Sequence, residues 1–187
     1  SDVYKRQIQT RALWRLRDKL AAFLKVCAVT VVHPVYPTEW INRTDPDTGE
    51  VVRRRSSRKG RAADVLAELY PLREFLKNPQ FHLRVVELET ERWDIGRSRG
   101  RKQHLDRVPR AFLREWVLES PEDYRELLPR EAPETFTAEE FGRLLHQRKD
   151  DAWQSLAVLE VLGLAERTEK QGRKNLYRLT ENALYEP

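Results

Sequence analysis

The sequence is poor in cysteine, methionine and long apolar runs, and each shortage excludes a class of protein. Its 187 residues include one cysteine, Cys27, and no methionine. A single thiol forms no internal disulfide, and with four scattered histidines it supplies no four-ligand zinc set. No apolar run approaches the about 20 residues that a membrane-spanning helix needs, and no secretory signal core is visible. We therefore expect a cytoplasmic protein with no membrane partner and no bound metal.

The chain also lacks the short motifs that mark common catalytic and cofactor sites. It contains no glycine-rich dinucleotide or P-loop motif, no HExxH and no GxSxG. The histidines stand apart from one another, and Cys27 lies in an apolar segment typical of a core. We therefore predict no cofactor and no catalytic residue, and we favour a protein that is not an enzyme.

Charge of both signs is abundant, and the basic residues are clustered. Lys and Arg number 35 against 30 Asp and Glu, which gives a net charge of +5 and a pI of about 9.4. Six of the nine residues 53–61 are basic, and a second basic run occupies residues 97–102. A phosphate backbone is the common partner of such clusters. A solvated surface is the alternative.

The first residues have an unusual sequence. Residues 2–7, Asp-Val-Tyr-Lys-Arg-Gln, resemble the translation of a sequencing adapter. We therefore expect residues 1–7 to be an artefact that is disordered and lies outside the fold. We also expect that a native upstream segment is missing.

The pattern of apolar residues predicts an α/β domain over residues 8–118 with arginine-rich loops. Apolar residues at three- and four-residue steps predict helices, and β-branched or alternating runs predict strands. In chain order the predicted elements are a helix over 8–25, a strand over 27–35 that Pro34 and Pro37 end or bend, a hairpin over 39–53 with a polar tip, a helix over 62–77 interrupted at Pro71, and strands over 81–89 and 112–118.

The order of elements over residues 120–187 predicts a winged helix-turn-helix domain. Thr137 and Glu140 have the spacing of a capping box at a helix start, and Gly163 has the place of a glycine that ends a helix. Three short helices over 121–128, 138–146 and 150–162 precede two strands over 164–169 and 175–180. The predicted fold class is therefore α+β: a small mixed α/β sheet domain followed by a winged helix-turn-helix.

The chain from Leu20 onward resembles a group of bacterial α/β proteins that end in a winged helix-turn-helix. The residues that carry the resemblance are Trp40 with Asp45-Pro46-Asp47-Thr48-Gly49-Glu50, Ala67-Glu68-Leu69-Tyr70, Arg107-Val108-Pro109, Leu128-Pro129 and Phe136-Thr137. The group has no assigned activity. The resemblance therefore implies architecture alone and gives no residue a role.

These features predict a DNA-binding protein, either regulatory or accessory to nucleic-acid processing, with double-stranded DNA as its partner. The second of the two closely spaced helices in a winged helix-turn-helix enters the major groove, where Gln154 and Ser155 can read base edges. Arginine offers a planar donor fork that suits phosphate. The predicted contact residues are Arg53, Arg54, Arg55, Arg58, Lys59, Arg61, Arg97, Arg99, Arg101, Lys102, Arg107, Arg148, Lys149, Gln154, Ser155, Lys170, Arg173 and Lys174.

Two other functions stay open. A metal-dependent, restriction-like nuclease, or a remnant of one, needs carboxylates gathered around Mg²⁺, and no acid of this chain stands before a well-placed lysine. A protein-interaction module is the other alternative, with a homodimer formed through the winged helix. It is favoured by Asp150 and Asp151, which begin the predicted groove helix and repel phosphate.

Overall fold

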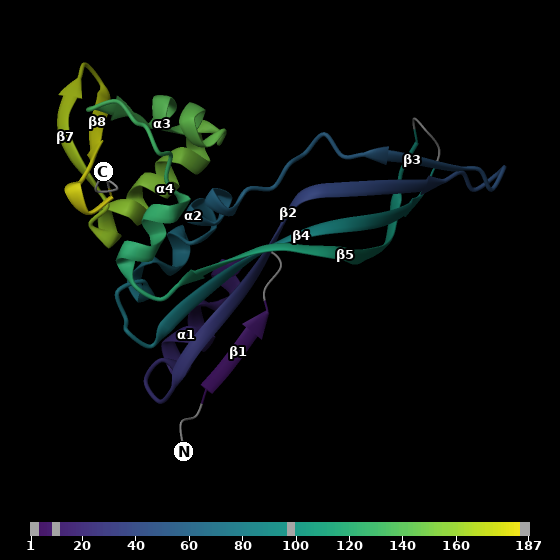
Figure 1. Cartoon of the computed structure of the whole chain (residues 1–187), viewed down its shortest axis with the longest axis horizontal. Coiled ribbons are helices and arrows are strands. Elements are labelled where there is room, and N and C mark those ends of the chain that lie inside the picture. The colour runs from purple at the N-terminus through teal and green to yellow at the C-terminus, as the bar shows by residue number, and fades with distance from the viewer. Residues whose placement is uncertain (1–3, 9–11, 97–99, 184–187) are drawn as a thin grey trace. The chain divides into compact units, whose positions relative to one another are not determined.

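The computed structural model describes residues 4–8, 12–96 and 100–183 and has a mixed α+β fold (Figure 1). Its chain divides into two compact units. The helical unit consists of Ser1–His33, Ala62–Val85 and Trp116–Pro187, and the strand unit consists of Pro34–Arg61 and Val86–Glu115. The helical unit contains residues from before and after position 119, so its bounds differ from those of the two predicted domains. The division into domains at 118–120 stays a prediction.

The larger sheet is mixed and has the order β1-β2-β4-β5, with β3 also paired to β2. Its strands are β1 (Tyr4–Ile8), β2 (Ala28–Thr44), β3 (Val51–Arg55), β4 (Phe81–Ile95) and β5 (Gln103–Leu118). β1 runs parallel to β2, and β3 runs antiparallel to it. The expectation that residues 1–7 lie outside the fold is wrong for Tyr4–Gln7, which pair with Ala28–Val31. An unpaired edge of a strand exposes backbone N–H and C=O groups, which can form hydrogen bonds with any extended segment whatever its side chains. Such pairing of β1 with β2 does not depend on the origin of residues 4–7.

Of the two effects predicted for Pro34 and Pro37, an end or a bend of the strand, the end is wrong, because β2 continues through both prolines. β1 pairs with β2 only as far as Val32, and β3 pairs with it only from Trp40 onward. Between these segments the described structure has no strand on that edge of β2. Proline is tolerated at an unpaired strand edge because no ladder hydrogen bond is lost there.

The helices before β4 are shorter than the apolar periodicity predicts. Residues within the predicted helix 8–25 form the 3₁₀ helix η1 (Leu13–Leu16) and α1 (Arg17–Phe23). The predicted interruption at Pro71 is confirmed, since residues 62–77 form η2 (Ala62–Asp64), α2 (Val65–Glu68) and η3 (Tyr70–Phe75). Four leucines along these elements are fully buried: Leu13, Leu66, Leu69 and Leu72.

The last part of the helical unit combines short helices with a three-stranded sheet. In chain order it contains η4 (Pro121–Leu127), β6 (Phe136–Thr137), α3 (Ala138–Leu145), α4 (Lys149–Leu162), β7 (Ala165–Gln171), β8 (Lys174–Leu179) and η5 (Glu181–Ala183). The sheet has the order β6-β8-β7 and is antiparallel. Gly163 ends α4 with a φ of 76°, which confirms its predicted place. Sequence reasoning missed β6, because two residues are too short for a periodic pattern.

The predicted capping box at the start of α3 is present. The Thr137 hydroxyl accepts a hydrogen bond from the Glu140 backbone N–H, and Glu140 accepts one from the backbone N–H of Thr137. The Thr137 backbone N–H and the Thr137 hydroxyl both donate to the Glu140 carboxylate, and these two hydrogen bonds, backbone first, hold the pKa of Glu140 below its ordinary value of 4.5. The stabilisation is therefore present above pH 4.5 and is lost as the pH falls through the lower pKa of the folded state.

Glu140→Gln is expected to flatten the acid side of the stability profile. The variant keeps an acceptor for the Thr137 backbone but removes the group whose protonation weakens the cap. Urea unfolding at pH 7, 4 and 3, followed by circular dichroism, measures the difference. Glu134→Gln, which changes an exposed glutamate before α3, serves as the control. An equal pH response in Glu140→Gln and the unchanged protein would contradict this prediction.

Candidate nucleic-acid interface

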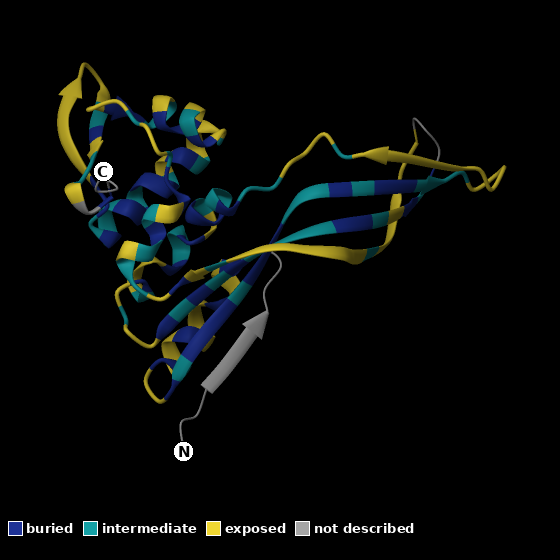
Figure 2. Cartoon of the chain, in the orientation of Figure 1, coloured by how far each residue is buried: buried dark blue, intermediate teal, exposed yellow. Residues whose placement is uncertain are grey.

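The arginines at 53–55 are presented on an exposed strand by a tightly closed turn. Asp45 begins the turn, and its carboxylate accepts hydrogen bonds from the backbone N–H groups of Asp47 and Thr48. Gly49 adopts a φ of 74°, as this type of turn requires. The turn fixes the register in which Arg53–Arg55 face Asn42–Trp40 across the β2–β3 ladder. Every residue of β3 is exposed (Figure 2).

One face of the strand unit carries a cluster around Glu91. Its carboxylate accepts a hydrogen bond from the Asn42 amide at 2.8 Å and lies 3.1 Å from Arg110 Nε. Arg53 lies 3.6 Å from the same carboxylate, and its guanidinium stacks over Trp40 at 4.7 Å from the ring centre. The Asn42 hydrogen bond, helped by Arg110 and Arg53, lowers the pKa of Glu91. Arg53 is therefore held in place by contacts within the unit.

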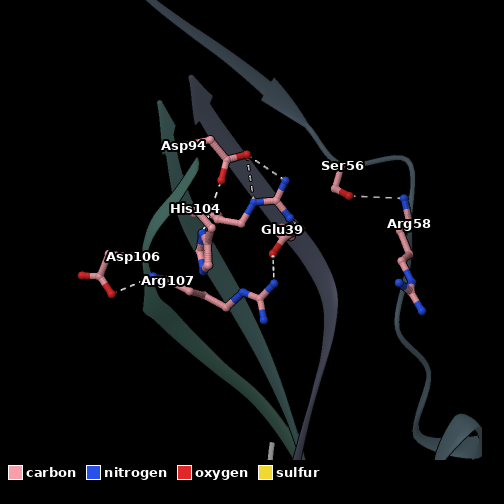
Figure 3. A network of polar contacts seen from close by, with 8 residues as sticks. Glu39, Ser56, Arg58, Asp94, His104, Asp106 and Arg107 are labelled. Carbon is pink, nitrogen blue, oxygen red and sulfur yellow. Dashed lines mark hydrogen bonds and ion pairs between the residues drawn. The ribbon is translucent and has the colours of Figure 1, made fainter. Parts of the chain in front are cut away.

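A second network lies on the opposite face and links β2, β4 and β5 (Figure 3). Arg92 donates to Glu39 at 3.1 Å and to Asp94 at 3.0 Å, and both carboxylates are buried. Arg107 lies 2.8 Å from the other Glu39 oxygen and stacks on Tyr36. Arg107, predicted as a nucleic-acid contact, is thus an internal partner of a buried carboxylate.

The segment after β3 is anchored at both ends by backbone hydrogen bonds. The Ser56 backbone N–H donates to the Glu39 carbonyl at 2.8 Å, and the Gly60 N–H donates to the Tyr36 carbonyl at 3.0 Å. A Cβ at Gly60 would stand 2.9 Å from the Tyr36 nitrogen, so only glycine fits there. Between the anchors, Arg58 and Lys59 are exposed and, among the described residues, have no acidic partner. Arg54 on β3 is equally exposed and free of ion pairs within the described chain.

The second predicted basic loop is described only in part. Arg97 and Arg99 lie outside the described residues. Arg101 and Lys102 are exposed and line a hollow together with Gly96. Gly96 has a φ of 151°, and its N–H donates to the Thr44 carbonyl, so the loop starts beside the end of β2.

The net positive charge of the chain resides in the strand unit. Residues 34–61 and 86–115 hold 15 Arg and Lys against 10 Asp and Glu, whereas the rest of the chain holds 20 of each. The contrast is sharper for residues 120–187, which hold 10 basic and 14 acidic residues. The whole net charge of +5 therefore belongs to the strand unit.

The residues predicted in the carboxyl-terminal part are less open than expected. Arg148 pairs with Asp151, and Lys174 pairs with Glu139. Ser155 is fully buried, and its hydroxyl donates to Gln147 at 2.9 Å, because position 155 lies on the apolar stripe of α4. Ser155 is therefore removed from the predicted contact set.

The other predicted residues differ in accessibility. Gln154 is half-buried. Arg55 donates to the Thr38 hydroxyl, and Arg61 has a partner of its own. Exposed cations in the last part of the chain that have no ion-pair partner among the described residues are Lys149, Lys170 and Arg173.

Sequence reasoning missed Arg92 and Arg110, which hold the two carboxylate clusters. The signal that was available is the spacing of the acids from Glu87 to Asp94: Glu87, Glu89 and Glu91 fall on one face of a strand, and Asp94 falls on the other. For the nuclease alternative, the described residues contain no group of three His, Cys, Asp or Glu side chains placed to hold a metal ion. None of the helices in the described part has the length and apolar composition needed to cross a membrane.

Comparison with known families adds one assignment. Residues 1–119 match the model described as "Domain of unknown function (DUF8091)". The chain belongs to the DUF8091 family. It is also 28% identical over 182 residues to an uncharacterized protein of Treponema pallidum (strain Nichols), across 92% of this chain and 70% of that protein. No solved structure matches. The DUF8091 match contains the whole strand unit and ends before residues 120–187.

Proposed function

We propose that this DUF8091 member binds nucleic acid and that its strand unit supplies the phosphate contacts. The observation that carries the proposal is the location of the net charge of +5 in this unit. Arg54, Arg58 and Lys59 add a group of exposed cations without acidic partners among the described residues. Cations already paired with carboxylates gain little from phosphate, whereas free cations release counterions when they bind it.

Rigid presentation supports the same proposal. Arg54 stands on a strand whose register is fixed, and Arg58 and Lys59 stand on a segment anchored at Ser56 and Gly60. Binding then costs less ordering of the backbone than it would on a free loop. Phosphate contacts of this kind carry no sequence information, so the strand unit is proposed to bind without strong sequence preference.

We further propose that residues 120–187 form a winged helix-turn-helix. Support comes from the order β6, α3, α4, β7, β8, from the sheet order β6-β8-β7, and from the glycine that separates α4 from β7. Because this segment has four more acids than bases, its proposed contribution to phosphate binding is confined to Lys149 and the wing-tip residues Lys170 and Arg173.

A protein-interaction role is the second candidate for the same segment. The observation that favours it is Trp153 on α4, which is 45% exposed beside Tyr70, with ring centres 5.1 Å apart. Exposed tryptophan with surrounding acids is more typical of a protein-binding surface than of a phosphate-binding one.

The test is a fluorescence-anisotropy titration of a labelled random 20-bp DNA duplex at 50 and 200 mM salt. Five cations of the strand unit (Arg54, Arg58, Lys59, Arg101 and Lys102) and three of residues 120–187 (Lys149, Lys170 and Arg173) make eight proposed contacts, which predict a loss of affinity of roughly 20,000-fold between the two salt concentrations. Changing Arg54, Arg58 and Lys59 together to Ala reduces the number of contacts to five and the predicted loss to roughly 500-fold.

The matched control changes Lys19, Lys25 and Arg130 to Ala. These three exposed cations belong to the helical unit, and the variant has the same net charge as the first one. Equal weakening by both variants would mean that only net charge matters and would contradict a local interface. Absence of binding at 50 mM salt would overturn the proposal altogether.

A further inference from the structure

Two aromatic side chains stand open on the strand unit, on the face that carries the Glu91 cluster. Side chains of β4 alternate between its two faces: Glu89 and Glu91 contact Trp40 and Asn42, whereas Arg92 and Asp94 belong to the Glu39 network. Trp93 therefore shares the face of Glu91. It is 38% exposed.

The same alternation applies to β5. Arg110 meets Glu91 on this face, so Phe112, two residues further on, lies on it as well. Phe112 is 63% exposed, although a phenylalanine of a sheet is ordinarily covered. We name Trp93, Phe112, Arg53 and Arg110 the aromatic face.

The aromatic face combines open rings with guanidinium groups held in fixed positions. Arg53 already covers Trp40, which leaves Trp93 and Phe112 as the open rings. Glu91 fixes both Arg53 and Arg110 by ion pairs. Planar rings interspersed with arginine planes are the surface on which unpaired bases stack.

Pairing of β5 with a second copy of this chain is a poorer explanation of the exposed rings. β5 has a single neighbour in the described sheet order, but Pro109 in its middle has no N–H to offer a further strand. Arg107, Arg110 and Arg114 add like charges along the same strand, which protects an edge from pairing.

We propose that the strand unit binds unpaired nucleic acid, with bases stacked on Trp93 and Phe112 and with phosphates on the free cations of the unit. This inference rests on the proposed nucleic-acid binding and narrows its substrate from phosphate backbones in general to single strands. A duplex hides the faces of its bases between neighbouring pairs, so only the single strand uses the two rings.

The experiment compares three labelled probes of nearly equal phosphate count: a 20-nucleotide oligo-dT, a 20-residue abasic strand and a 10-bp duplex. We expect oligo-dT to bind at least tenfold more tightly than the other two. Phe112→Ala and Trp93→Ala are each expected to weaken oligo-dT binding about tenfold and to leave abasic-strand and duplex binding unchanged. Phe112→Trp is expected to retain the affinity.

Leu113→Ala is the matched control, since Leu113 is 46% exposed and, by alternation, lies on the opposite face of β5. Tryptophan fluorescence gives an independent readout, because stacking on Trp93 quenches emission and Trp93→Phe removes that quenching. Salt-dependent binding of all three probes with equal affinity, unaffected by Phe112→Ala, would overturn the stacking inference and leave the phosphate proposal standing. Failure of every probe to bind would overturn both. Light scattering gives the molar mass in solution of the unchanged protein and of Phe112→Ala. A lower molar mass for Phe112→Ala would mean that the ring serves self-association and would overturn the inference.

Discussion

Replacing Arg92 with methionine is expected to open the strand unit while the helical unit stays folded. Arg92 is the shared partner of Glu39 and Asp94, whose side chains are only 9% and 5% exposed. Methionine fills much of the space but leaves two buried carboxylates without their main counter-charge. Breaking a buried ion pair from one side costs about 3–5 kcal/mol. We expect the lower end, since Arg107 stays near Glu39 and His104 stays near Asp94.

Hydrogen exchange followed by mass spectrometry measures this effect segment by segment. A loss of about 3 kcal/mol corresponds to exchange that is faster by roughly 150-fold for amides protected by opening of the strand unit. Peptides from residues 62–76 and 138–162 are expected to keep their exchange rates, because they belong to the helical unit.

Two further variants make the Arg92 prediction decisive. Arg92→Met combined with Glu39→Gln and Asp94→Asn removes the uncompensated charges and is expected to recover most of the protection. Arg110→Met breaks an ion pair whose arginine side chain is 57% exposed, and it is expected to cost less than about 1 kcal/mol. Uniformly faster exchange in both units, or no recovery in the triple variant, would show that the network does not hold the strand unit together.

Phe141→Ala is expected to destabilise the helical unit by about 3–5 kcal/mol. Phe141 lies on α3, is fully buried and stacks on Phe136 of β6 with ring centres 5.2 Å apart. Truncation leaves a cavity that the neighbouring α4 cannot close without leaving its own partners. Urea unfolding followed by far-ultraviolet circular dichroism gives the change in the free energy of unfolding.

Leu144→Ala on the same helix is the matched control. Leu144 is half-buried, so the expected loss is well below that of Phe141→Ala. Nucleic-acid affinity at low temperature, where the Phe141 variant is still folded, is expected to stay unchanged because the substitution removes none of the exposed cations. Equal destabilisation by the two variants would contradict the central place of Phe141 in this core.

Features of the fold that depend on neighbouring residues were predictable from the sequence. The Thr137–Glu140 cap, the end of α4 at Gly163 and the break at Pro71 each follow from contacts within a few residues, and the structure confirms all three. The length of β2 was not predictable in the same way. Its continuation through Pro34 and Pro37 depends on which stretch of its edge is unpaired, and distant strands decide that.

The candidate interface likewise has one part that was predictable from the sequence and another that was not. The basic run over residues 53–61 is a property of the linear sequence and was predicted. The separation of free cations from paired ones was not predicted. Arg92 donates to Glu39, which lies 53 residues away in the sequence. Ser155 is buried in the core because of the way α4 packs.

By itself the sequence determined the net charge, the basic run, the local caps and turns, and the lack of the common catalytic motifs, because each depends on residue type and short spacing. Only the tertiary structure decided that the excess charge gathers in one unit, that Arg54, Arg58 and Lys59 remain open, and that Trp93 and Phe112 share a face. The physical reason is that strand pairing brings together residues far apart in the chain. The register of that pairing then determines which charges neutralise each other and which face the solvent.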